Sequence, residues 1–217
     1  MDHLADALNL EGLARQQRGD LDGALEDFVE AMEIWHQRSS PHNEGQTLIN
    51  VGNTKAMRKQ YAEAADTFQR AAALLQASDR DAADNVALIA GDIYLQLDRL
   101  DEASGIFRAV VNQATSYEER ADRMNRIGAL AEKQLKRGMI DRALRVLKDC
   151  YEWNLEDGYL PDAAACLINI GSILKMTGDA EGARPSLQKA ILLLKDHPQH
   201  PLLARAEALL SPGSLGE

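Results

Sequence analysis

Small and apolar residues recur in five segments of the chain with one shared spacing. In the first half of each segment an apolar residue stands four positions before a small residue, which we call the anchor. The anchors are Gly12, Gly52, Gly91, Ala131 and Gly171, at intervals of 40, 39, 40 and 40 residues. Because residues four apart share one side of an α-helix, each first half is predicted to be a helix with a narrow face at its anchor. Gly128 is an alternative anchor in the fourth segment, but it would require a three-residue insertion, so Ala131 is preferred.

The second half of each segment also has helical spacing. In the first segment Ala24 is followed by Phe28 and then by Ala31. The small residues let two helices approach closely, and the large side chain fills the space beyond them. Turns such as Gly19-Asp20 separate the two halves; glycine suits the left-handed end of a helix, and acids suit the start of the next one. Each segment is therefore predicted to be two helices joined by a tight turn. The large residues equivalent to Phe28 are Phe68, Phe107, Leu147 and Leu187.

These helix pairs define the expected domain organisation. We predict a single domain over residues 1–210, in which an amphipathic helix at residues 201–210 caps the last pair, followed by a disordered tail at 211–217. Pro185 falls inside the last pair, where it removes a backbone hydrogen bond and either kinks the second helix or delays its start. The pairs are expected at about residues 4–38, 44–78, 83–115, 120–155 and 162–195.

The spacing of Gly or Ala, Ala, Phe or Leu, and Ala over roughly residues 4–195 resembles the tetratricopeptide repeat. The usual repeat of that family has 34 residues, whereas this one has 40 and lacks the closing proline. The longer form is similar to the repeats of kinesin light chains, polarity-scaffold proteins and bacterial peptide-sensing regulators. The resemblance implies an all-α fold, a right-handed superhelix (solenoid) of five helix-turn-helix repeats with a C-terminal capping helix. It also implies that one face of each first helix lines a concave groove that binds a protein or a peptide.

Asparagine is concentrated on that face. The face comprises thirty helical positions opposite the anchors, and six of the nine asparagines in the chain fall there. An amide side chain both donates and accepts hydrogen bonds, so a row of amides could hold the backbone of an extended segment of roughly 12 residues. An amphipathic helix is an equally suitable ligand. The alternative interpretation is that these amides bond only to neighbouring helices.

The candidate binding residues combine these amides with apolar and charged neighbours. In the long-repeat relatives, asparagines at two of these positions contact the partner, and the matches here are Asn50, Asn53 and Asn169. Chaperone-binding relatives use a carboxylate clamp, which only Asn50 matches, so a chaperone tail is not the expected ligand. Because the face carries few charges, we expect binding to depend little on salt. The candidate set is Asn9, Leu13, Gln16, Asn50, Asn53, Met57, Asn85, Asp92, Asn125, Lys136, Asn169 and Lys175.

Composition argues against several classes of function. The formal net charge is −10 and no basic run is present, so we do not expect the chain to neutralise the phosphates of a nucleic acid. No stretch approaches 18 consecutive apolar residues, so no membrane-spanning helix is predicted. A cytoplasmic location is the resulting expectation.

Motifs of catalysis are also missing from the sequence. Without a phosphate loop, a nucleophile elbow or a zinc-protease motif, we predict neither enzymatic activity nor a cofactor. His197 and His200 stand three apart, but no further ligand pattern accompanies them, so a solvated loop is preferred to a metal site. Cys150 and Cys166 fall at core-like positions and are expected to be buried thiols.

The sequence predicts an adaptor or scaffold that binds a protein or peptide in the groove of a helical solenoid. Two alternatives remain open. The chain could be a regulatory sensor whose superhelix changes when a peptide or small effector binds. It could also be a scaffold that forms a homo-oligomer through its uncapped first repeat.

Overall fold

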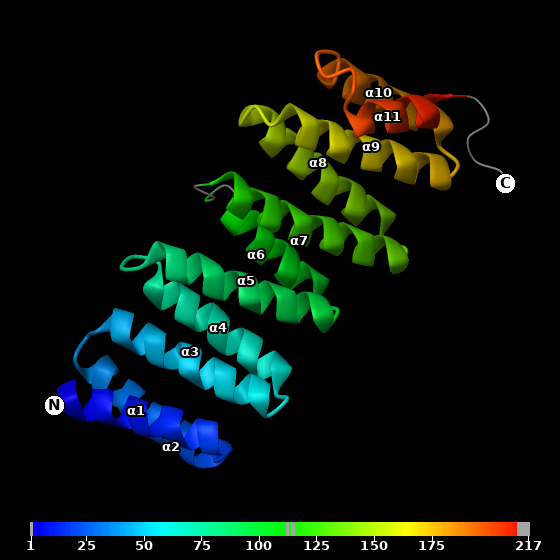
Figure 1. The fold of residues 1–217 in the computed structure, drawn as a ribbon. Coiled ribbons are helices and arrows are strands. Elements are labelled where there is room, and N and C mark those ends of the chain that lie inside the picture. Colours follow the sequence, from blue (N-terminus) through cyan, green and yellow to red (C-terminus); the bar gives the residue numbers. More distant parts are fainter. Residues whose placement is uncertain (1, 112, 114–115, 212–217) are drawn as a thin grey trace. The chain divides into compact units, whose positions relative to one another are not determined.

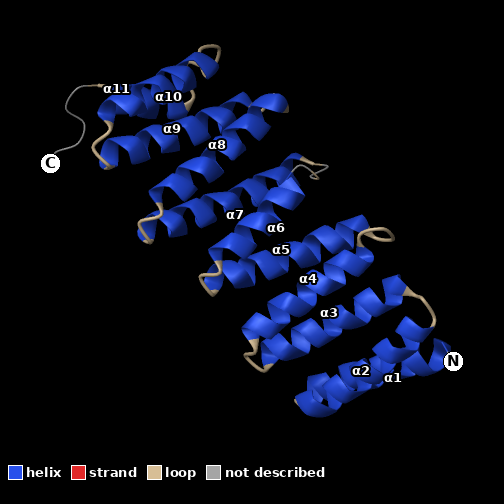
Figure 2. Cartoon of the chain, turned by 180° about the vertical axis from the view of Figure 1, so that it is seen from behind, coloured by secondary structure: helices blue, strands red, loops and turns tan. Residues whose placement is uncertain are grey.

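The computed structural model describes residues 2–111, 113 and 116–211, and within these ranges the chain forms α-helices and no strand (Figure 1, Figure 2). The predicted all-α class is confirmed. None of the described helices is long and apolar enough to cross a membrane. The helices are α1 (Asp2–Arg18), α2 (Leu21–Gln37), α3 (Pro41–Met57), α4 (Tyr61–Leu75), α5 (Arg80–Gln96), α6 (Leu100–Val111), α7 (Tyr117–Lys136), α8 (Ile140–Glu156), α9 (Leu160–Met176), α10 (Ala180–Leu193) and α11 (Pro201–Leu210).

The chain divides into two compact units, residues 1–113 and 114–217. In the first unit each helix from α1 to α6 packs against the next one, and α1 also contacts α3. In the second unit α7 to α10 pack in the same sequential way, and α11 packs against both α9 and α10 (Figure 1). The single domain over residues 1–210 stays a prediction. Of the regions predicted above, residues 114–115 of the third pair and residues 212–217 of the tail lie outside the described residues.

The anchors of the first unit are glycines because a phenylalanine ring occupies the space of a side chain. A Cβ atom built on Gly12 would lie 2.6 Å from the ring of Phe28, and one built on Gly52 would lie 2.6 Å from the ring of Phe68. Gly91 stands in the same relation to Phe107, at 2.5 Å. Since real Cβ contacts are longer than this, the close approach predicted from the spacing is confirmed in all three pairs of the first unit.

The second unit keeps the spacing but changes the residues. Gly171 lies against Leu187, where a Cβ atom would come within 2.6 Å of the leucine side chain. In the preceding pair the anchor position holds Ala131, which is buried. Gly128 is exposed, and a Cβ atom added there would meet nothing within 4 Å. The choice of Ala131 over Gly128 as anchor is therefore confirmed.

The turns between paired helices repeat one backbone conformation with different residues. Gly19 and Gly138 have positive φ angles of 84° and 71°, which glycine adopts without steric cost. The equivalent turns after α3 and α5 place Lys59 at 63° and Asp98 at 62°. The left-handed helix end is thus kept even where the glycine is missing.

Pro185 lies inside α10 without delaying that helix. The helix begins at Ala180, and the carboxylate of Asp179 accepts a hydrogen bond from the backbone N–H of Gly182 at its start. The alternative that Pro185 postpones the helix start is therefore wrong. Pro185 is the sixth residue of α10 and has no N–H to donate, so the helix continues through it with one backbone hydrogen bond missing.

Candidate functional site

Each anchor faces the partner helix of its pair, so the candidate face on the opposite side of the first helix is turned away from that partner. On α3, Asn50 is half-buried while Asn53 and Met57 are exposed, and 54% of Met57 is accessible. On α5, Asn85 is exposed and Ile89 is 44% accessible. Among the described residues, the side-chain amides of Asn50, Asn53 and Asn85 form no hydrogen bond with the protein. Amide and apolar groups therefore lie together on two successive first helices of the first unit.

The amides of α1 are used differently. The Nδ2 of Asn9 donates to the Oγ1 of Thr47, and the Nε2 of Gln16 donates to the Oγ1 of Thr54, both at 2.9 Å. Both threonines are completely buried in α3. Each threonine hydroxyl in turn donates to the carbonyl oxygen four residues earlier in its own helix, at 3.0 and 2.8 Å. We call this arrangement the amide–hydroxyl ladder, and it joins α1 to α3.

Leu13 and Asp92, the remaining candidates of the first unit, are both half-buried. Leu13 packs against the core cluster that contains Phe28 and Val51. It therefore belongs at least partly to the contact between the first and second helix pairs. Asp92 lies on α5, two turns beyond Asn85 on the same side of the helix.

The second unit has a hollow of about 300 Å³ on the corresponding face of α7 and α9. The sequence placed Asn169 on this face but did not predict the hollow beside it. Gly128 leaves space in the hollow because it has no side chain. A glycine on the candidate face of a helix, away from the anchor position, was the sequence signal for such a hollow. The residues that line it are Gly128, Ala131, Glu132, Leu135, Leu147, Asn169, Ser172, Ile173 and Met176.

The polar candidates around this hollow already have partners within the second unit. The Oδ1 of Asn169 accepts a hydrogen bond from Arg205 of α11 at 3.2 Å, and the Nζ of Lys175 donates to the backbone oxygen of Leu209. Lys136 forms an ion pair with Glu132 at 2.6 Å, and its hydrogen bond lowers the pKa of that carboxyl. Helix α11 thus occupies part of the polar surface that the sequence assigned to a ligand.

Asn125, the last candidate, is exposed on α7. Its side-chain amide has no hydrogen-bond partner in the described part of the chain. In this it is similar to Asn53 and Asn85 of the first unit. The structure therefore divides the candidate amides into two groups, those that bond to a neighbouring helix and those that present free donors and acceptors to solvent.

The two thiols lie close together in the second unit, away from this face. Cys150 of α8 is buried, and Cys166 of α9 is half-buried. The Nδ2 of Asn154 lies 2.9 Å from the backbone oxygen of Cys150 and 3.8 Å from the sulfur of Cys166. A hydrogen bond between the thiols, with burial, raises the pKa of Cys150, and the same bond lowers the pKa of Cys166.

The described helices α1 to α4 correspond to a known sequence family. Residues 3–77 match the model of the tetratricopeptide repeat. This part of the chain is therefore similar in sequence to tetratricopeptide repeats. Asn9, Gln16, Asn50 and Asn53 all lie within the matched residues. Asn85 lies beyond them, on the first helix of the next tetratricopeptide-like pair.

Several solved structures align with most of this chain. The structure of the MamA protein aligns with a TM-score of 0.50 at 16% identity, over 93% of this chain and 97% of that chain. A putative kinesin light chain from Podosopora anserina with nearly identical TPR-like repeats aligns with a TM-score of 0.48 at 16% identity, over 92% and 100%. BtubC from P. vanneervenii aligns with a TM-score of 0.49 at 19% identity, over 92% and 84%.

At these identities the likeness to MamA concerns the fold alone, and the tetratricopeptide-type solenoid predicted from the spacing is confirmed. A search of curated proteins gave no significant match to the sequence. The repeats therefore establish what kind of scaffold presents the face, and the side chains on the face must indicate what it binds.

Proposed function

We propose that this protein is an adaptor that binds a peptide segment of another protein along the exposed face of α3 and α5. The supporting observation is the contrast between two groups of amides on the candidate face of successive first helices. Asn9 and Gln16 donate to buried threonines, whereas Asn50, Asn53 and Asn85 keep donors and acceptors that no other described residue uses. Asparagine is a mediocre helix former, so its placement on exposed helix surface is better explained by an external partner.

The ligand proposed for this face is a segment recognised mainly by its backbone. The exposed amides can pair with backbone N–H and C=O groups, while Met57 and Ile89 offer apolar contact for its side chains. No charged side chain is needed for this mode of binding. The proposal includes a cytoplasmic setting and binding without catalysis, as expected from the sequence.

The test is a triple variant, Asn50→Ala/Asn53→Ala/Asn85→Ala. Peptides selected from a random display library on the full chain should bind the variant at least about tenfold more weakly, because each lost hydrogen bond contributes about 1 kcal/mol. The melting temperature should change little, because none of the three side-chain amides bonds to another described residue and alanine is the better helix former. The dissociation constant should rise less than about threefold between low and moderate salt.

Two control variants make the result specific. Gln37→Ala/Gln76→Ala removes exposed amides at the carboxyl ends of the second helices α2 and α4 and should leave the affinity unchanged. Asn9→Ala/Gln16→Ala removes the amide–hydroxyl ladder and should lower the free energy of unfolding by about 1–2 kcal/mol. Peptides that bind the triple variant as tightly as the unaltered chain, or whose affinity collapses with salt, would contradict the proposal.

A further inference from the structure

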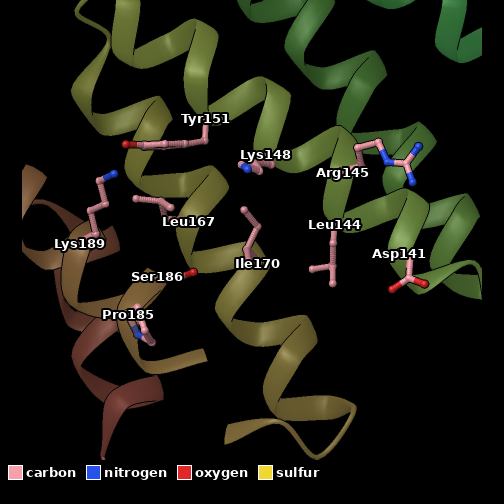
Figure 3. A pocket seen from close by; sticks show the side chains of 10 residues that line it. All are labelled: Asp141, Leu144, Arg145, Lys148, Tyr151, Leu167, Ile170, Pro185, Ser186 and Lys189. Atoms are coloured by element: carbon pink, nitrogen blue, oxygen red, sulfur yellow. The ribbon is translucent and has the colours of Figure 1, made fainter. Parts of the chain in front are cut away.

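The second unit contains another cavity, on the side formed by its second helices. It has a volume of about 460 Å³, within the range typical of small-molecule sites, and it lies between α8, α9 and α10 (Figure 3). Its surface is mainly apolar. The apolar side chains that line it are Leu144, Tyr151, Leu167, Ile170 and Pro185.

Cations surround this apolar floor. Arg145 and Lys148 come from α8 and Lys189 comes from α10, and Asp141 is the acid among the lining residues. In Figure 3, Leu167 and Ile170 of α9 lie between the two helices that carry the lysines. The cavity is therefore bordered by three positive charges and one negative charge, although the whole chain has a formal net charge of −10. A local excess of this sign favours an anion.

Each of the two lysines has one intramolecular contact: Lys148 forms a long ion pair with the exposed Glu152, and Lys189 lies over the ring of Tyr151. The Nζ of Lys148 lies 3.9 Å from the nearest carboxylate oxygen of Glu152, and 69% of its side chain is accessible. The Nζ of Lys189 lies 4.7 Å from the centre of the Tyr151 ring, which holds the ammonium at the edge of the cavity without neutralising it.

We infer that this cavity binds an aliphatic carboxylate of medium chain length. The hydrocarbon chain would cover the leucine and isoleucine floor, and the carboxylate would lie between Lys148 and Lys189. An apolar body without charge would leave the cationic border unused, and a small anion without an apolar body would leave the floor exposed to water. The occupant must therefore combine both properties. This site is separate from the face of the proposed function.

The test compares three probes of different chemistry on the full chain. Octanoate should bind, octan-1-ol should bind at least tenfold more weakly, and acetate should not bind, as measured by titration calorimetry. In methyl NMR spectra, octanoate should shift the signals of Leu144, Leu167 and Ile170 and leave those of Ile89 and Ile173 in place. Absence of octanoate binding, equal binding of octan-1-ol, or shifts confined to other methyl groups would each overturn the inference.

Variants then test the two parts of the site. Lys148→Gln/Lys189→Gln should weaken octanoate binding at least tenfold, whereas Lys59→Gln/Lys195→Gln, which changes the net charge equally, should not. Ser186→Phe places a ring in the cavity and should abolish binding at an unchanged melting temperature. If the phenylalanine variant does not fold, the lysine pair and its control still decide the question, and equal affinities in those two variants would refute the role of the cations.

Discussion

The two units satisfy one repeat spacing with different side-chain volumes. In residues 1–113 a phenylalanine ring lies against a glycine anchor in every helix pair, as Phe68 does against Gly52. In residues 114–217 the large residue is leucine, and one of the two anchors, Ala131, carries a Cβ atom. A leucine does not by itself free space at the anchor: Ala131 is accommodated in the pair that contains Leu147, whereas a Cβ atom on Gly171 would still lie 2.6 Å from Leu187.

The units also differ in how they satisfy buried polar groups. The first unit buries Thr47, Thr54 and Thr67, each of which donates to a carbonyl oxygen of its own helix. The second unit buries longer side chains that reach another helix. Arg120 of α7 donates to the backbone oxygen of Trp153 in α8 at 3.0 Å and forms an ion pair with Asp157. The buried hydroxyls of the first unit thus each have a partner within their own helix, whereas Arg120 of the second unit has its partners at the end of the next helix.

The largest effect that tests this comparison is expected from removing a large residue. Phe68→Ala should lower the free energy of unfolding by about 3–5 kcal/mol because it empties the space of a buried ring. Leu147→Ala should cost less, because a smaller side chain leaves a smaller cavity. Urea denaturation followed by circular dichroism measures both values. A larger loss for Leu147→Ala would contradict the volume argument.

A smaller effect is expected when volume is added at the anchor. Gly52→Ala should lower the free energy of unfolding by about 1–3 kcal/mol, because the new Cβ atom would fall 2.6 Å from Phe68. Gly128→Ala is the matched control in the second unit, since nothing lies within 4 Å of its Cβ position. It should raise the free energy of unfolding by about 0.5–1 kcal/mol through helix propensity alone. If both substitutions shift stability in the same direction, the assignment of anchors is wrong.

The smallest effect concerns one hydroxyl group in each unit. The hydroxyl of Tyr94 donates to the carboxylate of Asp66 at 2.6 Å, whereas the hydroxyl of Tyr151 is buried and has no partner among the described residues. Burial and the bond to Asp66 raise the pKa of Tyr94. Both rings lie beneath a cation, with Arg99 4.3 Å from Tyr94 and Lys189 4.7 Å from Tyr151.

Tyr94→Phe should therefore lower the free energy of unfolding by about 1 kcal/mol, while Tyr151→Phe should leave it unchanged or raise it by up to about 1 kcal/mol. Thermal melting of the two variants side by side provides the measurement. An equal loss in both would mean that the Tyr151 hydroxyl has a partner after all.

Features with a local period could be predicted from the sequence. The helix pairs, the anchors and the left-handed turns depend on residues within about forty positions, and small, large and turn-forming side chains mark them directly. The use of each amide could not be predicted in this way. Whether Asn9 contacts a ligand or Thr47 depends on how two helices lie beside each other, and only the shared seven-residue separation of Asn9 from Gln16 and of Thr47 from Thr54 hinted at the answer.

The cavity between α8, α9 and α10 was also beyond sequence reasoning. The cavity depends on the sizes of side chains from three helices. It also depends on the position of Pro185 inside α10, which continues past the proline. Lys148 and Lys189 lie 41 residues apart, and neither belongs to a motif. Surface charge at this separation becomes informative only when the packing of the second helices is known.

The amide–hydroxyl ladder has a mechanical consequence for the first two helix pairs. Its two bonds are seven residues apart on both helices, a lever arm of about 10 Å along the axis. A single bond would act as a pivot, but two at this distance prevent α1 from sliding along α3 or swinging about it. The two bonds thereby fix the position of α1 along α3. If a bound peptide pulled on Asn50 or Asn53 of α3, α1 would move together with α3.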